Sequence, residues 1–146
     1  MEKEQIPGII IGKLMNIGGM LQRQGNKMLL PFNLNQQQFS IFFEIAKAGK
    51  VKQKEMVNRL MLEKAHVSKV VKKLQQMELI TITKNDEDKR SYWLSVTGKG
   101  EKILKQCTEI FSDWNRQWIC EIDETELSSI VDNLTILQNI FKEKTR

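Results

Sequence analysis

The stretch from Lys64 to Met77 constrains the fold of this chain most strongly, because its two sides differ completely in character. Apolar residues spaced at i, i+3, i+4 and i+7 form a single stripe on a helix. This stretch places five residues on such a stripe, namely Val67, Val70, Val71, Leu74 and Met77. Lys69, Lys72 and Gln76 point the other way. The pattern predicts a helix that is buried along one side and open along the other.

The open side of this predicted helix is positively charged. Its four lysines (Lys64, Lys69, Lys72 and Lys73) are accompanied by no carboxylate, although exposed helices normally mix signs to gain i, i+4 pairs. From Lys50 to Arg90 the chain has 11 Lys or Arg and 6 Asp or Glu, while the rest has 12 of each. The net charge of +5 therefore lies in this segment. A basic surface confined to one module indicates a nucleic-acid partner, and an ordinary basic patch is the alternative.

The residues on either side predict a winged helix-turn-helix. Residues 50–60 have the apolar spacing of a short helix, followed by a turn at 61–63 that lacks the glycine often found there. After the basic helix, residues 79–83 and 92–96 alternate with the period of two half-buried strands. The polar residues 84–90 would form the tip of this two-stranded ribbon.

The ribbon tip contains a candidate groove contact. Lys89 and Arg90 would project from it, and Asp88 is spaced to hold the Arg90 guanidinium in one orientation. A narrow minor groove has an enhanced negative potential that stabilises an inserted arginine. The alternative is an exposed ion pair that contributes under about 1 kcal/mol.

Two helices are predicted before this module. Apolar residues at helical spacing indicate the first over residues 5–30, ended by Pro31. It contains five glycines, namely Gly8, Gly12, Gly18, Gly19 and Gly25. Three interpretations are open: close approach of a second helix in a dimer, room beside a small-molecule pocket, or flexibility without function. A capping box of Asn35 and Gln38 begins the second helix, and Gly49 ends it. Its expected buried stripe is Phe39, Phe42, Phe43 and Ala46.

Two long amphipathic helices are predicted after the ribbon. Thr97 caps the first, whose apolar face is Ile103, Leu104, Cys107, Ile110, Phe111, Trp114 and Trp118. Residues 123–126 have the spacing of a capping box for the last helix, whose apolar face is Leu127, Ile130, Val131, Leu134, Leu137 and Phe141. Both stripes are longer than a module of this size needs for its own core. We therefore expect them to pack against a second copy of the chain.

Several classes of protein find no support in the sequence. It has neither a leader pattern nor an apolar run of about 18 residues, which predicts a cytoplasmic protein with no membrane partner. One histidine and no Cys-x-x-Cys argue against a metal site, and no cofactor is expected. No Gly-rich phosphate loop follows a strand, and no nucleophile is paired with a histidine. We do not expect an enzyme.

Cys107 and Cys120 are predicted to lie on one helix, which excludes a disulfide between them. Thirteen residues of helix separate their Cα atoms by roughly 20 Å, whereas a bridge needs less than about 7 Å. Cys107 shares the apolar face of its helix and is expected to be a buried structural thiol. A redox sensor is the alternative.

With these residues in hand, the chain resembles the MarR (multiple antibiotic resistance regulator) family over nearly its whole length. The most specific match is Asp88-Lys89-Arg90 followed by residues 94–100, which is similar to that family's wing signature and the helix start after it. The resemblance implies a mainly α fold with a small β wing in a single domain, residues 1–146. Residues 1–34 and 98–146 would form dimerisation helices around a DNA-binding lobe at about residues 35–97.

The resemblance also implies a function. A homodimer would place the helix from Lys64 in the major groove of a palindromic operator and Arg90 in the minor groove. Such proteins are usually repressors released by a small-molecule effector or by oxidation of a cysteine near the start of the first helix, where this chain has none.

Individual contacts follow from position on the helix. Near its start, the candidates for base-edge contact are His66, Ser68, Lys69 and Lys72, and Lys64 and Lys73 are the candidates for phosphate. Two other functions remain open. One is a winged-helix module that binds an acidic protein, and the other is a redox-sensing regulator that uses Cys107 or Cys120.

Overall fold

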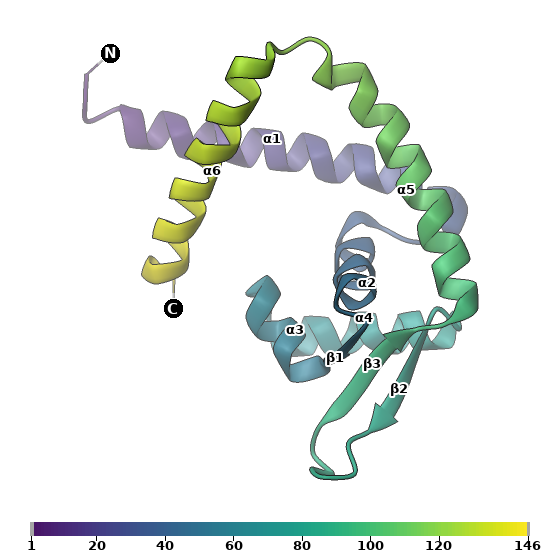
Figure 1. Cartoon of the computed structure of the whole chain (residues 1–146). Helices are drawn as coiled ribbons and strands as arrows, with labels where there is room; N and C mark the ends of the chain where they lie inside the picture. The colour runs from purple at the N-terminus through teal and green to yellow at the C-terminus, as the bar shows by residue number, and fades with distance from the viewer. Residues whose placement is uncertain (1, 146) are drawn as a thin grey trace. The chain divides into compact units, whose positions relative to one another are not determined.

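The computed structural model describes residues 2–145, which form two compact units, one up to Thr108 and one from Glu109. Figure 1 shows the order of the elements along the chain. The helices are α1 (Ile6–Leu29), α2 (Gln36–Ala48), α3 (Gln53–Leu60), α4 (Lys64–Gln76), α5 (Gly98–Ile119) and α6 (Glu124–Lys144). The predicted mainly α fold with a small β wing is confirmed. No helix in residues 2–145 is long and apolar enough to span a membrane.

The sheet has three antiparallel strands rather than the expected two. Strand β3 (Tyr92–Val96) lies between β1 (Lys50–Lys52) and β2 (Ile80–Lys84). The prediction that residues 50–52 belong to a helix is therefore wrong. Val51 is buried and lies opposite Leu94 of β3. Three residues with one apolar side chain fit the first turn of a helix equally well, so only the pairing with β3 distinguishes a strand.

The buried stripe of α4 is the part of the core that the sequence predicted best. Val67, Val70, Val71 and Leu74 are buried, and Met77, the last member of the stripe, is half-buried. They belong to a core that includes residues from the sheet, the first two helices and the link between α4 and β2, among them Leu29, Phe42, Ile45, Val51, Leu79, Ile80 and Leu94. Burial along one side of α4 leaves its lysine-bearing side uncovered.

The buried face of α2 differs from the predicted one. Phe39 and Phe42 are buried as expected, but Phe43 is 41% exposed and Ala46 is half-buried. Ile41 and Ile45 are buried instead. The reason is that α2 packs against α1, α3, α4 and the sheet, which cover a wider arc than one stripe.

Only one of the five glycines in α1 is explained by packing within the described chain. A Cβ at Gly25 would overlap the side chain of Gln36, so α1 and α2 approach closely there. Asn26, next to it, accepts a hydrogen bond from the backbone N–H of Gln36 at 2.7 Å. The other four α1 glycines have open space where a side chain would begin. After α1, Pro31 lies inside a short 3₁₀ turn, Leu30–Phe32.

Two of the three predicted N-terminal helix caps are present. Asn35 and Gln38 form the full capping box of α2, with side-chain to backbone bonds of 2.8 and 3.0 Å. The Thr97 hydroxyl accepts from the N–H of Gly100 at 2.9 Å. The capping box at the start of α6 is wrong, because Asp123 makes no side-chain cap bond. Glu124 and Glu126 instead place negative charge in the first turn, where the helix dipole favours it.

The two cysteines are in different surroundings. Cys107 is buried in α5, and Cys120 is exposed one residue beyond the end of that helix. The prediction that both cysteines lie on one helix is therefore wrong by one residue. Both thiols are free.

Candidate nucleic-acid interface

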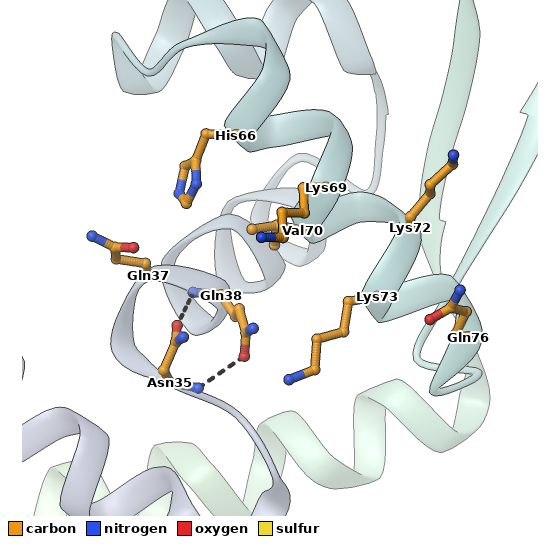
Figure 2. A pocket seen from close by; sticks show the side chains of 9 residues that line it. All are labelled: Asn35, Gln37, Gln38, His66, Lys69, Val70, Lys72, Lys73 and Gln76. Atoms are coloured by element: carbon orange, nitrogen blue, oxygen red, sulfur yellow. Dashed lines mark hydrogen bonds between the residues drawn. The ribbon is translucent and has the colours of Figure 1, made fainter.

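The open side of α4 lines a groove whose opposite wall is the N-terminal turn of α2. Figure 2 shows side chains from both helices around this groove. It has a volume of about 640 Å³ and is lined by Asn35, Gln37, Gln38, His66, Lys69, Val70, Lys72, Lys73 and Gln76. All of these residues lie in the first compact unit. We call this feature the α2–α4 groove.

The α2–α4 groove is lined by basic and amide side chains without a carboxylate. Lys69 and Lys72 are exposed, whereas His66 and Lys73 are half-buried. Lys64, at the first position of α4, is also exposed. Within residues 2–145 no α4 lysine takes part in an ion pair. This unopposed positive charge favours a ligand that brings its own negative charge.

The turn between α3 and α4 holds the second helix at a set angle to the first. Met61 adopts the left-handed conformation at φ 52° and ψ 39°, a role for which glycine is the usual residue. Gln53 in the first turn of α3 donates a hydrogen bond to the Ser68 hydroxyl at 3.0 Å. Ser68, a predicted base contact, is therefore half-buried against α3, while the hydrogen of its hydroxyl remains available to a ligand.

The wing tip is organised by a residue that the sequence did not single out. Asn85 is buried, its side-chain oxygen accepts from the N–H of Glu87 at 3.0 Å, and its amide donates to the Ser91 hydroxyl at 3.2 Å. Its own N–H donates to the Ser91 carbonyl. An asparagine is a common turn residue, but within seven polar residues nothing marked this one as buried.

Asp88 has a different partner from the predicted one. Its carboxylate accepts a hydrogen bond from the backbone N–H of Arg90 at 3.0 Å, two residues along the chain. The expected contact with the Arg90 guanidinium is wrong for this structure. Within the described residues Arg90 forms no ion pair, and its side chain is exposed beside Lys89. Asp88 thus shapes the backbone of the tip and does not hold the arginine side chain.

A second basic cluster, which the sequence did not predict, lies on the sheet. The ammonium groups of Lys50 and Lys52 lie 4.8 and 5.2 Å from the centre of the Trp93 ring. Such distances allow a cation–π attraction. The cluster depends on the pairing of β1 with β3, so the linear sequence carries no signal for it.

Sequence reasoning also missed the amide residues of the α2–α4 groove as candidate contacts. The sequence marks Asn35 and Gln38 only as helix caps and assigns no role to Gln37. They lie opposite α4 only because α2 packs across it, a tertiary relation. Gln76 is predicted on the outward side of the helix, and the structure confirms this position.

The fold and the basic groove together define a winged helix-turn-helix protein. A model of the MarR family matches residues 34–92, from the residue before the α2 cap to the start of β3. This segment is similar to the MarR family, and the fold of the chain matches that of MarR winged-helix regulators.

Individual relatives and solved structures are similar to this chain over most of its length. The chain is 29% identical over 114 residues to the HTH-type transcriptional regulator BilQ of Clostridioides difficile, covering 78% of this chain and 77% of that protein. Its fold is similar to the transcriptional regulator BldR from Sulfolobus solfataricus, with a TM-score of 0.83, 18% identity and coverage of 95% and 99%. A mutant MarR from E. coli complexed with operator DNA matches with a TM-score of 0.80, 19% identity and coverage of 94% and 99%.

Proposed function

We propose that this protein is a homodimeric, sequence-specific DNA-binding transcriptional regulator that acts as a repressor. The observation that carries the proposal is the α2–α4 groove, in which one side of α4 presents lysines and amides with no carboxylate. The major groove of DNA is about 12 Å wide and admits one helix. The related E. coli MarR structure contains operator DNA, which supports the same partner here.

The proposed roles of the α4 residues follow from their positions on the helix. His66, Lys69 and Lys72 would reach base edges, and Ser68 would add a donor from its hydroxyl while it still accepts from Gln53. Lys64 and Lys73 would contact phosphates. These contacts would fix register, whereas the base contacts would determine sequence preference.

The wing would provide a second contact with the duplex. Arg90 and Lys89 are exposed at the tip, and Asp88 holds the backbone on which Arg90 stands. A narrow minor groove would stabilise the arginine through its negative potential. The absence of an ion pair at Arg90 within the described residues means that no pair must be broken for this contact.

Exposed apolar residues support the proposed homodimer. In α6 they include Ile130, Leu134 and Phe141, which are 42%, 47% and 38% exposed and recur at helical spacing. In α1 they include Ile6, Ile9, Met15 and Met20. Monomeric proteins rarely leave such long apolar stripes in water. A two-fold dimer would bind a palindromic site whose half-sites are about 34 Å apart.

Release of the DNA by a small-molecule effector is part of the proposal and rests on the similarity to the MarR family alone.

The alternative is release of the DNA by oxidation of a cysteine. Only one of the two cysteines is readily accessible to an oxidant. Cys107 is buried, and desolvation raises the pKa of its thiol to about 11, so little thiolate forms at neutral pH. Cys120 is exposed and is the residue to test for oxidation.

Selection from a random DNA library tests the function and requires no known operator. A sequence-specific regulator should enrich one palindrome, and its affinity should fall by orders of magnitude between about 50 and 200 mM salt. A winged-helix module for an acidic protein would enrich no sequence. Recovery of an unenriched library would therefore refute the proposed function.

Two substitutions test the assigned contacts on the selected duplex. Arg90→Ala should weaken binding by roughly tenfold, as expected for loss of a charged groove contact, and should leave the dimer intact. Lys69→Ala should change the preferred sequence rather than only the affinity. Lys102→Ala is the matched control, because Lys102 is an exposed lysine on α5 outside the α2–α4 groove.

A further inference from the structure

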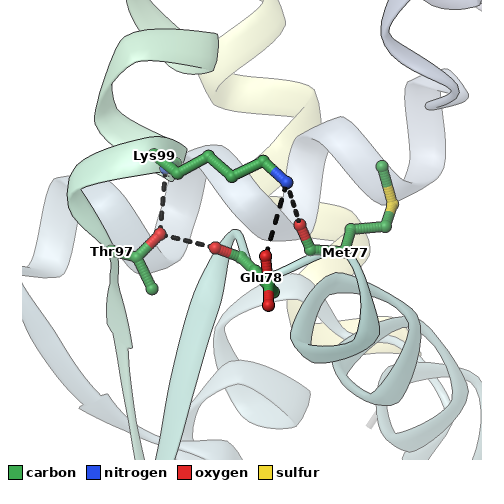
Figure 3. Close-up of polar contacts among 5 residues, drawn as sticks. Met77, Glu78, Thr97 and Lys99 are labelled. Carbon is green, nitrogen blue, oxygen red and sulfur yellow. Dashed lines mark hydrogen bonds and ion pairs between the residues drawn. The ribbon is translucent and has the colours of Figure 1, made fainter.

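The end of α4 is joined to the start of α5 by a compact set of polar contacts, shown in Figure 3. We define this α4–α5 junction as Met77, Glu78, Leu79, Thr97, Lys99 and Gly100. Glu78 has a left-handed backbone at φ 62°, which turns the chain from α4 into β2. The amides of Met77, Glu78 and Leu79 bond to the carbonyls of Lys73, Gln75 and Leu74. The chain is thus tightly wound where α4 ends.

One hydroxyl connects the two helices at this junction. Thr97 Oγ1 donates to the Glu78 carbonyl at 2.7 Å and accepts from the Gly100 N–H at 2.9 Å. The second bond caps α5, and the first holds the backbone immediately after α4. The backbone N–H of Thr97 also donates to the Leu79 carbonyl at 3.0 Å. A movement of the first turn of α5 therefore acts directly on the residues that end α4.

Lys99 provides a second connection from α5. Its ammonium group donates to the Met77 carbonyl at 3.1 Å and lies 3.7 Å from the Glu78 carboxylate. Carbonyls at the C-terminal end of a helix lack helical partners and attract cations. Lys99 is thus placed against the end of α4 although it belongs to α5.

Gly100 permits this close contact. It is buried, and a Cβ at this position would overlap the backbone carbonyl of Leu79 and the side chain of Val96. The backbone of α5 therefore packs directly against the chain that leaves α4. No space remains for a side chain at this point between the two segments.

We propose that Thr97 and Lys99 are positioning residues that hold α4 at the angle required to read DNA by tying its C-terminal end to the first turn of α5. This inference rests on the proposed DNA-binding function. Base contacts need hydrogen-bond geometry accurate to a fraction of an ångström, whereas phosphate contacts tolerate displacement. Loosening the junction should therefore reduce specific binding and spare non-specific binding.

The test compares Thr97→Val, which removes both hydroxyl bonds at similar size, with Thr97→Ser, which keeps the hydroxyl. Affinity is measured for the duplex that the parent protein selects and for a scrambled duplex of the same composition. Thr97→Val should lower specific affinity by roughly tenfold, since it loses two hydrogen bonds, while non-specific affinity changes by less than about twofold. Thr97→Ser should keep the ratio of specific to non-specific affinity at the value of the parent protein. The proposal is overturned if Thr97→Val leaves this ratio unchanged.

Amide hydrogen exchange without DNA provides an independent measurement. In Thr97→Val the amides of Met77, Glu78 and Leu79 should exchange faster, because the end of α4 is released. If only Gly100 and its neighbours in α5 exchange faster, Thr97 is a simple cap and the proposal is overturned. Failure of the parent to select any duplex would refute the proposed function, while the exchange data would still decide whether the junction restrains α4.

Lys99→Met keeps the proposal testable if Thr97→Val does not fold. The lysine is exposed, so its replacement by a side chain of similar length should leave the fold intact. We expect a smaller fall in the ratio of specific to non-specific affinity than for Thr97→Val. An unchanged ratio in a folded Lys99→Met variant would overturn the assignment of Lys99.

Discussion

Met61 carries the turn between α3 and α4 in a conformation that its side chain disfavours. A left-handed backbone costs a residue with a Cβ about 1 kcal/mol, and Met61 is 47% exposed, so its side chain contributes little packing in return. We expect Met61→Gly to stabilise the folded protein by roughly 0.5 to 1 kcal/mol. Urea unfolding would measure the change. Met61→Ala, which retains the Cβ, is the control and should bring no such gain.

Cys107 should make stability depend on pH in the alkaline range. Burial raises its pKa from the ordinary 9.0 to about 11, so the folded state holds the thiol proton more tightly than the unfolded state. The contribution of Cys107 to the free energy of unfolding is fully present below pH 9. It falls by about 2 kcal/mol as the pH rises toward 11. Lysine side chains also titrate in this pH range and contribute to the pH dependence of the parent protein and the variant alike. The difference in unfolding free energy between the parent and Cys107→Ala should therefore be compared at pH 8 and pH 11, and a constant difference would contradict the assignment.

At the scale of the element, the wing owes its shape to its turn rather than to an ion pair. Asn85 makes two side-chain hydrogen bonds inside the hairpin, to Glu87 and Ser91. Asn85→Ala should lower stability by about 1 to 2 kcal/mol and accelerate amide exchange in residues 84–92. Asp86→Ala, which alters an exposed neighbour, should leave both unchanged. Equal effects of the two substitutions would show that the bonds of Asn85 are not special.

The helices differ in how well the sequence predicted their faces. The stripe of α4 was correct because α4 is buried along one side and its other side is polar. The stripe of α2 was partly wrong because several elements surround that helix, so Ile41 and Ile45 are buried outside the predicted stripe. Strand β1 was missed because three residues have too little periodicity. For both α2 and β1, contacts with other elements decide what the local pattern leaves open.

At the scale of the whole molecule, the exposed apolar stripe of α6 predicts self-association. Leu134→Glu places a charge in the middle of this stripe and should raise the dissociation constant of the proposed dimer at least tenfold, since burying a leucine stabilises by about 1.5 to 3 kcal/mol. Sedimentation equilibrium would measure this. Ser128→Glu adds the same charge at another exposed position of α6 and should leave association unchanged. A parent protein that is monomeric at micromolar concentration would contradict the prediction.

The sequence by itself determined the features that depend on residues near one another in the chain. These are the two-sided character of α4, the cap of α2, the alternating strands of the wing and the concentration of positive charge between Lys50 and Arg90. Such features follow from helical and strand periodicity and from local hydrogen bonds.

Only the tertiary structure decided which distant residues meet. It placed the amides of α2 across from the lysines of α4 and paired β1 with β3 so that two lysines lie over the Trp93 ring. It also brought Thr97 and Lys99 against the end of α4. The physical reason is that each contact joins elements that are brought together by burial of apolar surface. This hydrophobic driving force is non-directional, so the sequence alone does not specify which elements meet. The partners of exposed polar groups then follow from how those elements pack.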